Sequence, residues 1–142
     1  MIVLDSSVAL KWIFADEDGA EHAFRAREDH ISGKNEIVVP NLFFYEIANV
    51  LATKVDLSAE ESLVGFDLIR SFELDARELS NTEFKEAMSL SMMYKVSAYE
   101  ASYHVLAANL ECPFLTADQK FWKKVDGLGV AKLLSTDLRI NY

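Results

Sequence analysis

The stretch that most constrains the fold stands at the start of the chain, where an apolar run ends abruptly in an acid. Residues 2–4 read Ile-Val-Leu, which is typical of a strand buried on both faces, and Asp5 follows directly. Ligands of open α/β sheets bind at the carboxyl ends of the strands, so Asp5 is a candidate site residue. The alternative is that Asp5 or Ser6 caps the short helix expected over residues 7–14.

Strand-like and helix-like patterns alternate along the rest of the chain. The patterns predict strands at residues 2–4, 36–39, 73–79, 114–116 and 130–134. They predict helices at residues 7–14, 20–31, 41–55, 58–72, 81–94 and 97–111 and around Phe121 and Trp122. Pro40 is expected to begin the helix at 41–55, and a polar tail is expected to end at Tyr142. This alternation favours an α/β fold, with a mostly parallel sheet covered by helices on both faces.

Length and composition bound the possible functions. The 142 residues suit one domain over residues 1–142, and no apolar run approaches the roughly 20 residues that span a bilayer, so we expect a cytoplasmic protein with no membrane partner. The single cysteine, Cys112, excludes a thiolate zinc cage and is expected in the core. The net charge of −9 argues against broad electrostatic binding of nucleic acid, so a polyanion would need metal ions or a local basic patch.

Three further acids are candidates for catalysis or metal binding. The position of each is also explained by a purely structural role. Glu46 lies in the middle of an apolar helix, where it needs a partner or a metal unless it lies at the solvent edge. Glu100 follows Ser97 at capping-box spacing. Asp118 ends the strand at 114–116 much as Asp5 ends the first strand, but it also suits the N-cap of the next helix.

Together the four acids predict a metal site. In a parallel sheet the two strand ends share one rim, and helices bearing Glu46 and Glu100 would overhang it. Four carboxylates repel one another unless cations bind, and oxygen ligands select Mg²⁺ or Mn²⁺. Such ions generate an attacking hydroxide and stabilise the leaving oxygen of a phosphodiester. We therefore expect Asp5, Glu46, Glu100 and Asp118 to be both metal ligands and catalytic residues.

Other residues support smaller expectations. His104, four residues after Glu100, is expected to hydrogen-bond to it or to add a nitrogen ligand. Lys11 with Trp12 and the segment 120–124 are candidates for contacts with a nucleic-acid substrate. The alternative is a solvated helix face with core aromatics, which is preferred for Phe121 and Trp122. The methionines of the helix at 81–94 are expected to fill gaps in the core: Met88, Met92 and Met93.

Four segments carry a resemblance to a known family, in the family's order and across nearly the whole chain. They are IVLDSSVALKW at residues 2–12, VVPNLFFYEIANVL at 38–51, VSAYEASYHVLAANL at 96–110 and PFLTAD at 113–118, which an aromatic helix follows. The chain resembles PIN domains and, among them, the VapC-type toxin ribonucleases of type II toxin–antitoxin modules. No single segment is specific to the family, but the set of four in this order is strong evidence for the resemblance.

The resemblance implies a three-layer α/β/α fold, a Mg²⁺- or Mn²⁺-dependent endoribonuclease, a homodimer and inhibition by a small cognate antitoxin. By position, Asp5, Glu46 and Asp118 match the family's acids, and Thr116 matches its hydroxyl residue. The third motif departs from the family pattern, because Glu100 stands where the family usually has Asp. The additional methylene group puts full activity in doubt.

Two other functions fit parts of the sequence. A PIN-like binding or regulatory module with weak or absent catalysis is the main rival, because of Glu100 and the acidic charge. A phosphatase with Asp5 as covalent nucleophile would normally place a second Asp two residues later, where this chain has Ser7. Nucleotide binding through a glycine loop is disfavoured because no glycine follows the first strand.

Overall fold

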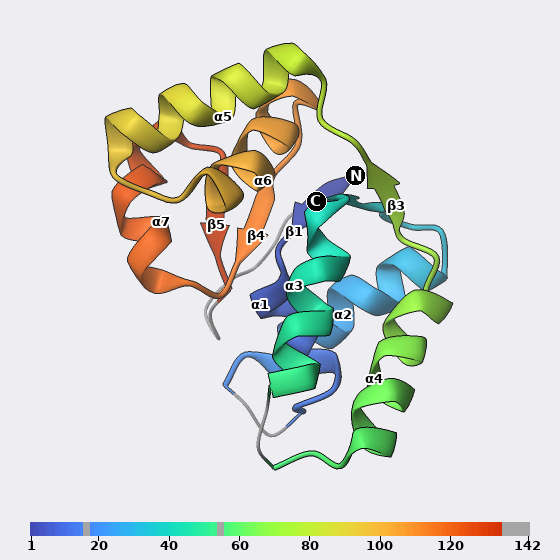
Figure 1. Ribbon diagram of the computed structural model, residues 1–142. Helices are drawn as coiled ribbons and strands as arrows, with labels where there is room; N and C mark the ends of the chain where they lie inside the picture. The colour runs from blue at the N-terminus through green and yellow to red at the C-terminus, as the bar shows by residue number, and fades with distance from the viewer. Residues whose placement is uncertain (16–17, 54–55, 135–142) are drawn as a thin grey trace.

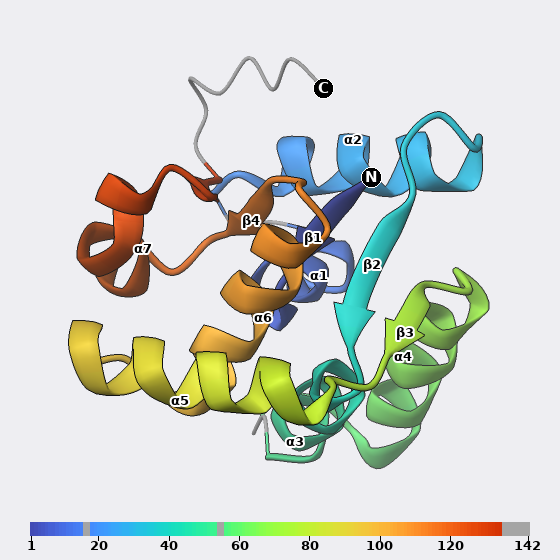
Figure 2. The same ribbon diagram turned by 90° about the horizontal axis from the view of Figure 1, so that it is seen from above.

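A computed structural model describes residues 1–15, 18–53 and 56–134 of the protein. Its centre is a five-stranded sheet in the order β3-β2-β1-β4-β5, whose strands are labelled between Figure 1 and Figure 2. The strands are β1 (Ile2–Leu4), β2 (Ile37–Pro40), β3 (Asp75–Arg77), β4 (Phe114–Thr116) and β5 (Ala131–Leu133). Every neighbouring pair is parallel, which confirms the sheet that the alternating pattern predicts.

The predicted strands differ from the observed ones mainly at their ends. The bounds of β1 and β4 match the prediction, whereas β3 and β5 are shorter than predicted. Pro40 does not begin the following helix; it is the last residue of β2 and is paired with Arg77 of β3. A proline is tolerated in this terminal position, where the strand is about to leave the sheet.

Seven α-helices surround the sheet in the described part of the chain. They are α1 (Ser6–Ala9), α2 (Ala20–Ile31), α3 (Leu42–Thr53), α4 (Ala59–Ser71), α5 (Asn81–Tyr94), α6 (Ala98–Asn109) and α7 (Gln119–Val125). Figure 2 shows α2 on one side of the sheet and α5 and α6 on the other, so the architecture is the predicted three-layer α/β/α arrangement. The predicted end of α3 at Val55 and the predicted polar tail lie outside the described residues.

Three of these helices begin with the same motif, a capping box. In α4, α5 and α6 an N-cap serine accepts a hydrogen bond from the backbone three residues later, and the glutamate there accepts one from the backbone of the serine. The pairs are Ser58–Glu61, Ser80–Glu83 and Ser97–Glu100. The spacing of Ser97 and Glu100 predicts the third of these boxes, and the structure confirms it. The three boxes are therefore matched local structures in different surroundings.

The core lies where α6 packs on the middle of the sheet. Strands β1, β2 and β4 are buried along their whole length, and α6 packs against all three. Seven consecutive residues of α6, from Ala101 to Ala107, are buried. This burial on all sides makes α6 the internal helix of the fold and brings its polar side chains to the centre of the molecule.

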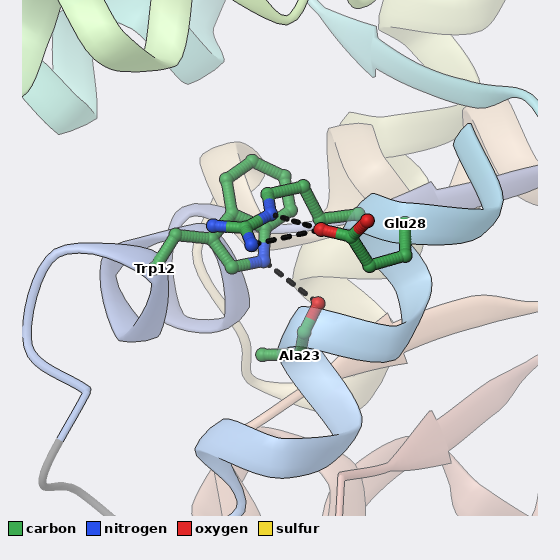
Figure 3. Close-up of polar contacts among 4 residues, drawn as sticks. Trp12, Ala23 and Glu28 are labelled. Atoms are coloured by element: carbon green, nitrogen blue, oxygen red, sulfur yellow. Dashed lines mark hydrogen bonds and ion pairs between the residues drawn. The ribbon is translucent and has the colours of Figure 1, made fainter. Parts of the chain in front are cut away.

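Trp12 belongs to the core and does not offer a stacking surface to RNA, so that prediction is wrong. The segment after α1 tightens into a 3₁₀ turn (Leu10–Trp12), and the predicted helix ends earlier than Phe14. Trp12 is 4% exposed, and its indole nitrogen donates a 2.8 Å hydrogen bond to the carbonyl of Ala23 in α2 (Figure 3). A buried indole requires such an acceptor for its N–H, and α2 supplies it.

The methionines of α5 are also placed differently from the prediction. Met88, Met92 and Met93 are 56%, 69% and 71% exposed, so they do not fill core gaps. Helix α5 packs on α6 and buries only Ala87 fully, which leaves its outer face to solvent. Among the described residues, no helix is long and apolar enough to cross a membrane.

Candidate active site

The candidate site lies where the sheet order changes direction. The chain passes from β1 to β2 on one side, and β4 lies on the other side of β1. The carboxyl ends of β1 and β4 are therefore adjacent, and a crevice opens between the connections that leave them. Asp5 follows β1, and Thr116 ends β4 just before Asp118.

Asp5 is held by both strand ends. Its Oδ1 accepts hydrogen bonds from the hydroxyl of Ser7 and, at 3.3 Å, from the backbone nitrogen of Val8, so Asp5 is the N-cap of α1. Its Oδ2 accepts a hydrogen bond from the hydroxyl of Thr116. Ser7 also accepts a 3.0 Å hydrogen bond from the backbone nitrogen of Ala117. These bonds join the segments after β1 and β4 into one rigid unit.

Asp118 is fixed from the same unit. Its backbone nitrogen donates to the Thr116 hydroxyl at 3.1 Å, and its Oδ1 accepts from the backbone nitrogen of Phe121 at 3.0 Å. Asp118 is thus the N-cap of α7, as the structural explanation predicts. The capping bond occupies only one of its two carboxylate oxygens. A structural role and a ligand role are therefore compatible at this residue.

Glu46 reaches the site from α3. It is half-buried, and its Oε1 accepts a 2.6 Å hydrogen bond from the hydroxyl of Tyr103 in α6. The prediction that an acid in this apolar helix needs a partner is confirmed by that bond. The partner joins two helices whose residues are 57 positions apart in the sequence.

Glu100 takes part in the capping box that opens α6. Its Oε2 accepts from the backbone nitrogen of Ser97 at 2.9 Å, and its own backbone nitrogen donates to the Ser97 hydroxyl at 3.0 Å. The reach of the longer side chain explains how a glutamate fits here, because it folds back over the first turn of the helix. One carboxylate oxygen is used in this way.

All four acids line one small cavity of about 110 Å³. Two aromatic residues of the core also border it, Phe114 and Phe121, together with Ser6, Ser7 and Tyr103. The cavity therefore combines a concentration of negative charge with an apolar wall. Asp5, Glu46, Glu100 and Asp118 come from four different parts of the chain and are brought together by the fold.

Burial, together with neighbouring negative charge, raises the pKa of two of these acids, Asp5 and Glu46. Burial raises the pKa of Asp5 to about 6, the charge of Asp118 adds to this, and the hydrogen bonds from Ser7, Thr116 and Val8 oppose it. Burial likewise raises the pKa of Glu46, with contributions from the charges of Asp5 and Glu100. Burial and the neighbouring Glu46 charge raise the pKa of Tyr103 well above its usual value, so its hydroxyl stays a donor.

The donors suit a hard divalent cation, although they do not already form a cage. Residues with carboxylate and hydroxyl oxygens line the cavity, and a cation would offset both the burial and the repulsion that raise the pKa values of Asp5 and Glu46. Within residues 1–15, 18–53 and 56–134, however, no three His, Cys, Asp or Glu side chains converge closely enough to hold an ion. The oxygen donors are therefore of the kind that a divalent cation prefers, but the carboxylates would have to move closer together to hold one.

The remaining candidates from the sequence are His104 and the segment 120–124. His104 is 3% exposed, does not line the cavity and has no hydrogen bond to either ring nitrogen, so the predicted bond to Glu100 is absent. Burial lowers the pKa of His104, which favours the neutral ring. Phe121 is buried, in agreement with the core alternative, while Trp122 is half-buried against the core. Lys120, Lys123 and Lys124 are exposed along α7, immediately after Asp118.

Two site residues were not predicted from the sequence. Ser7 stands where a phosphatase of the kind considered would have a second aspartate, and no sequence pattern marks it as a site residue, yet it joins the two strand ends. Tyr103 was not considered, although it stands three residues after Glu100 and therefore on the same face of a helix. That spacing is the signal that identifies it.

Comparisons with known proteins agree with this architecture. The PIN domain model matches residues 2–128. No curated protein sequence matches the chain at a significant level.

Two solved structures share the fold at low identity. The crystal structure of PAE2754 from Pyrobaculum aerophilum has a TM-score of 0.65 at 17% identity, covering 87% of this chain and 84% of its own. A toxin–antitoxin complex from Klebsiella pneumoniae has a TM-score of 0.67 at 11% identity, covering 93% of this chain and 96% of its own. With its fold, its acid-lined cavity and a family match over almost its full length, the chain belongs to the PIN domain family.

Proposed function

We propose that this protein is a metal-dependent endoribonuclease and the toxin of a type II toxin–antitoxin module. The observation that carries the proposal is the cavity at the carboxyl ends of β1 and β4, which four carboxylates from separate elements line. PIN domains are generally nucleases, and such an acidic cavity is what metal-assisted cleavage of a phosphodiester requires.

In this proposal Asp5, Glu46, Glu100 and Asp118 hold Mg²⁺ or Mn²⁺. A cation held there would provide an activated water and would stabilise negative charge on the leaving oxygen. The chain's own residues orient the ligands, because Ser7 and Thr116 fix both oxygens of Asp5. Phe114 and Phe121 provide an apolar wall that strengthens the electrostatic interactions inside.

RNA would approach along α7. The protein as a whole carries a net charge of −9, which repels phosphates. Lys120, Lys123 and Lys124 stand exposed on the helix that Asp118 caps, so they place positive charge beside the cavity. We assign these lysines to contacts with the RNA phosphates. Trp12 is buried and therefore has no part in RNA binding in this proposal.

Asp5→Asn tests the proposal directly. Asn retains the N-cap function but removes the charge, so cleavage of RNA in Mg²⁺ or Mn²⁺ should fall by about 100-fold or more. The matched control is Asp67→Asn, which changes an exposed acid of α4 away from the cavity and should leave the rate unchanged. If Asp5→Asn cleaves RNA as the wild-type protein does, the proposed function is wrong.

The assignment of α7 to RNA has a separate test without catalysis. In EDTA, Lys120→Gln with Lys123→Gln should weaken RNA binding and reduce the salt dependence of log Kd by roughly 0.7 per lysine removed. Lys85→Gln on α5 is the control, because this lysine is also exposed but is carried by another helix. Equal salt slopes in all three proteins would exclude α7 from the RNA path.

The toxin assignment adds a small cognate antitoxin, a homodimer and a cytoplasmic location. The similar structure from Klebsiella pneumoniae is a toxin–antitoxin complex, which supports an antitoxin partner. Exposed apolar side chains on two helices support protein partners in general, namely Leu63, Val64 and Leu68 on α4 and Phe84, Met88, Met92 and Met93 on α5. Light scattering of the purified protein, alone and with the product of a neighbouring small gene, measures both associations.

The rival function is a PIN-like binding module with weak or absent catalysis. One observation favours it: no three acids in the described residues converge on a common point, and Glu100 is already used in capping α6. Thermal unfolding separates the two functions, because a ligand that binds the native state raises Tm. The nuclease proposal predicts a rise with millimolar Mn²⁺, whereas an unchanged Tm favours the binding module.

A further inference from the structure

The hydroxyl of Tyr103 links two walls of the acidic cavity. Tyr103 is 1% exposed and donates a 2.6 Å hydrogen bond to Oε1 of Glu46. Its ring stacks on that of Phe114 in β4, with centroids 5.6 Å apart and planes inclined by 7°. The ring is therefore clamped between α6 and the sheet, and its hydroxyl has a fixed position at the edge of the cavity.

Glu46 depends on that hydroxyl for its orientation. It stands on α3 and is itself half-buried, so it lies at the border between core and solvent. Among the described residues, the bond from Tyr103 is the hydrogen bond that the Glu46 carboxylate accepts. A glutamate has several rotatable bonds, and without this donor its side chain is free to turn toward water.

We propose that Tyr103 is a positioning residue for the cation: its hydroxyl occupies Oε1 of Glu46 and directs Oε2 into the cavity as a single ligand oxygen. The inference rests on the proposed function, because it assumes that the cavity binds a divalent cation. Hydrogen-bonded partners behind a ligating carboxylate commonly change metal affinity by about 10- to 100-fold. Tyr103 itself touches neither the cation nor the RNA in this proposal.

Tyr103→Phe tests the inference because it removes the hydroxyl and keeps the ring that stacks on Phe114. Titration of the metal-free protein with Mn²⁺, followed by calorimetry, should show an affinity about 10-fold weaker than wild type. RNA cleavage at saturating Mn²⁺ should recover kcat, while KM for RNA stays unchanged throughout. Tyr94→Phe is the matched control, since Tyr94 is a half-buried tyrosine of α5 that does not line the cavity.

A double-mutant cycle with Glu46→Gln identifies the route of the effect. If Tyr103 acts through Glu46, the double variant should bind Mn²⁺ no more weakly than Glu46→Gln alone. Additive losses would overturn the inference, as would wild-type Mn²⁺ affinity in Tyr103→Phe. A wild-type protein that binds no Mn²⁺ overturns the proposed function, and this inference with it, so the two failures are distinguishable.

A second measurement uses the wild-type chain and covers the case in which Tyr103→Phe does not fold. Binding of Mg²⁺ to Oε2 of Glu46 draws charge away from the hydrogen bond with the Tyr103 phenol. The near-ultraviolet absorption of this buried tyrosine should therefore shift during the titration, and Tyr94→Phe should show the same shift. A cation-saturated protein without the shift overturns the inference.

Discussion

The cavity has two sides that hold their acids in different ways. On the strand side, Asp5 uses both carboxylate oxygens in hydrogen bonds from three donors, two of them hydroxyls that join β1 to β4. On the helix side, Glu46 and Glu100 each accept one hydrogen bond, from Tyr103 and from the Ser97 backbone. The strand side is built into the centre of a parallel sheet, whereas the helix side depends on single contacts.

The different number of hydrogen bonds on the two sides suggests different roles for them in the proposed metal site. If the proposed cation binds, the rigid strand side would fix its position, because Asp5 and Asp118 are tied by hydrogen bonds to both strand ends. On the helix side, each of the two carboxylates uses one oxygen in its hydrogen bond, so under the same proposal its second oxygen would be available to the cation. This division also explains why the four acids line one cavity without already forming a cage.

The strand side should show its rigidity in Thr116→Val, the change with the largest expected effect on stability. The variant removes the hydroxyl that donates to Asp5 and accepts from the Asp118 backbone, so two polar groups lose a partner. We expect a loss of about 2–3 kcal/mol in the free energy of unfolding at pH 7, measured by urea denaturation. Thr53→Val, at an exposed helix hydroxyl, should change stability by less than about 0.5 kcal/mol. Similar losses in both variants would contradict a special role for Thr116.

Asp5 should make the stability of the cation-free protein fall with rising pH. Its pKa in the folded protein is about 6, above the ordinary value of 3.8, so between these values the folded state binds more protons than the unfolded state. Stability contributed by the protonated form is present below about pH 4 and is lost as the pH rises through 6. The rise in the pKa of Asp5 from 3.8 to about 6 corresponds to at most about 3 kcal/mol, which is the upper limit of the expected change in the free energy of unfolding.

The comparison of wild type with Asp5→Asn isolates this contribution. Unfolding in urea is measured from pH 4 to pH 8 in EDTA, and the difference between the two proteins is plotted against pH. Asp5→Asn should become relatively more stable as the pH rises, because the amide cannot ionise. A difference that is constant with pH would contradict the raised pKa.

The strand side is also the part of the site that the sequence predicts well. Asp5 and Asp118 follow short apolar strands, and the parallel order that brings them together follows from the alternation of strands and helices. The capping box at Ser97 is likewise a local pattern and is confirmed. In these cases the interaction lies within a few residues, or follows from a general rule of parallel sheets.

The helix side and the outer layer depend on tertiary packing, which local patterns do not contain. The bond between Tyr103 and Glu46 forms only because α3 and α6 meet at the end of the sheet. Next to Lys11 in the sequence, Trp12 is predicted to be a stacking surface, but in the structure its indole donates a hydrogen bond to the carbonyl of Ala23 in α2. Met92 reads as core filler, yet α5 forms the outermost layer and leaves it exposed.

The capping box on the helix side should matter less for stability than Thr116. Ser97→Ala removes the N-cap of α6, for which we expect a loss of about 1 kcal/mol in the free energy of unfolding. Ser80→Ala makes the same change in α5, away from the cavity, and should cost a similar amount. Only Ser97→Ala should also alter Mn²⁺ affinity, because it loosens the turn that holds Glu100. Unchanged Mn²⁺ affinity in Ser97→Ala would show that the box does not position the ligand.

The smallest effect on stability, and the sharpest test of the helix side, belongs to Glu100→Gln. Glutamine also closes a capping box, so the unfolding free energy in EDTA should stay within about 0.5 kcal/mol of wild type. The variant nevertheless removes one negative charge from the cavity, and Mn²⁺ affinity should fall in calorimetric titration. Glu83→Gln is the matched control, because Glu83 closes the same kind of box in α5 but does not line the cavity. Equal Mn²⁺ affinity in both variants would mean that Glu100 serves the helix alone and that the cation is held by the other three acids.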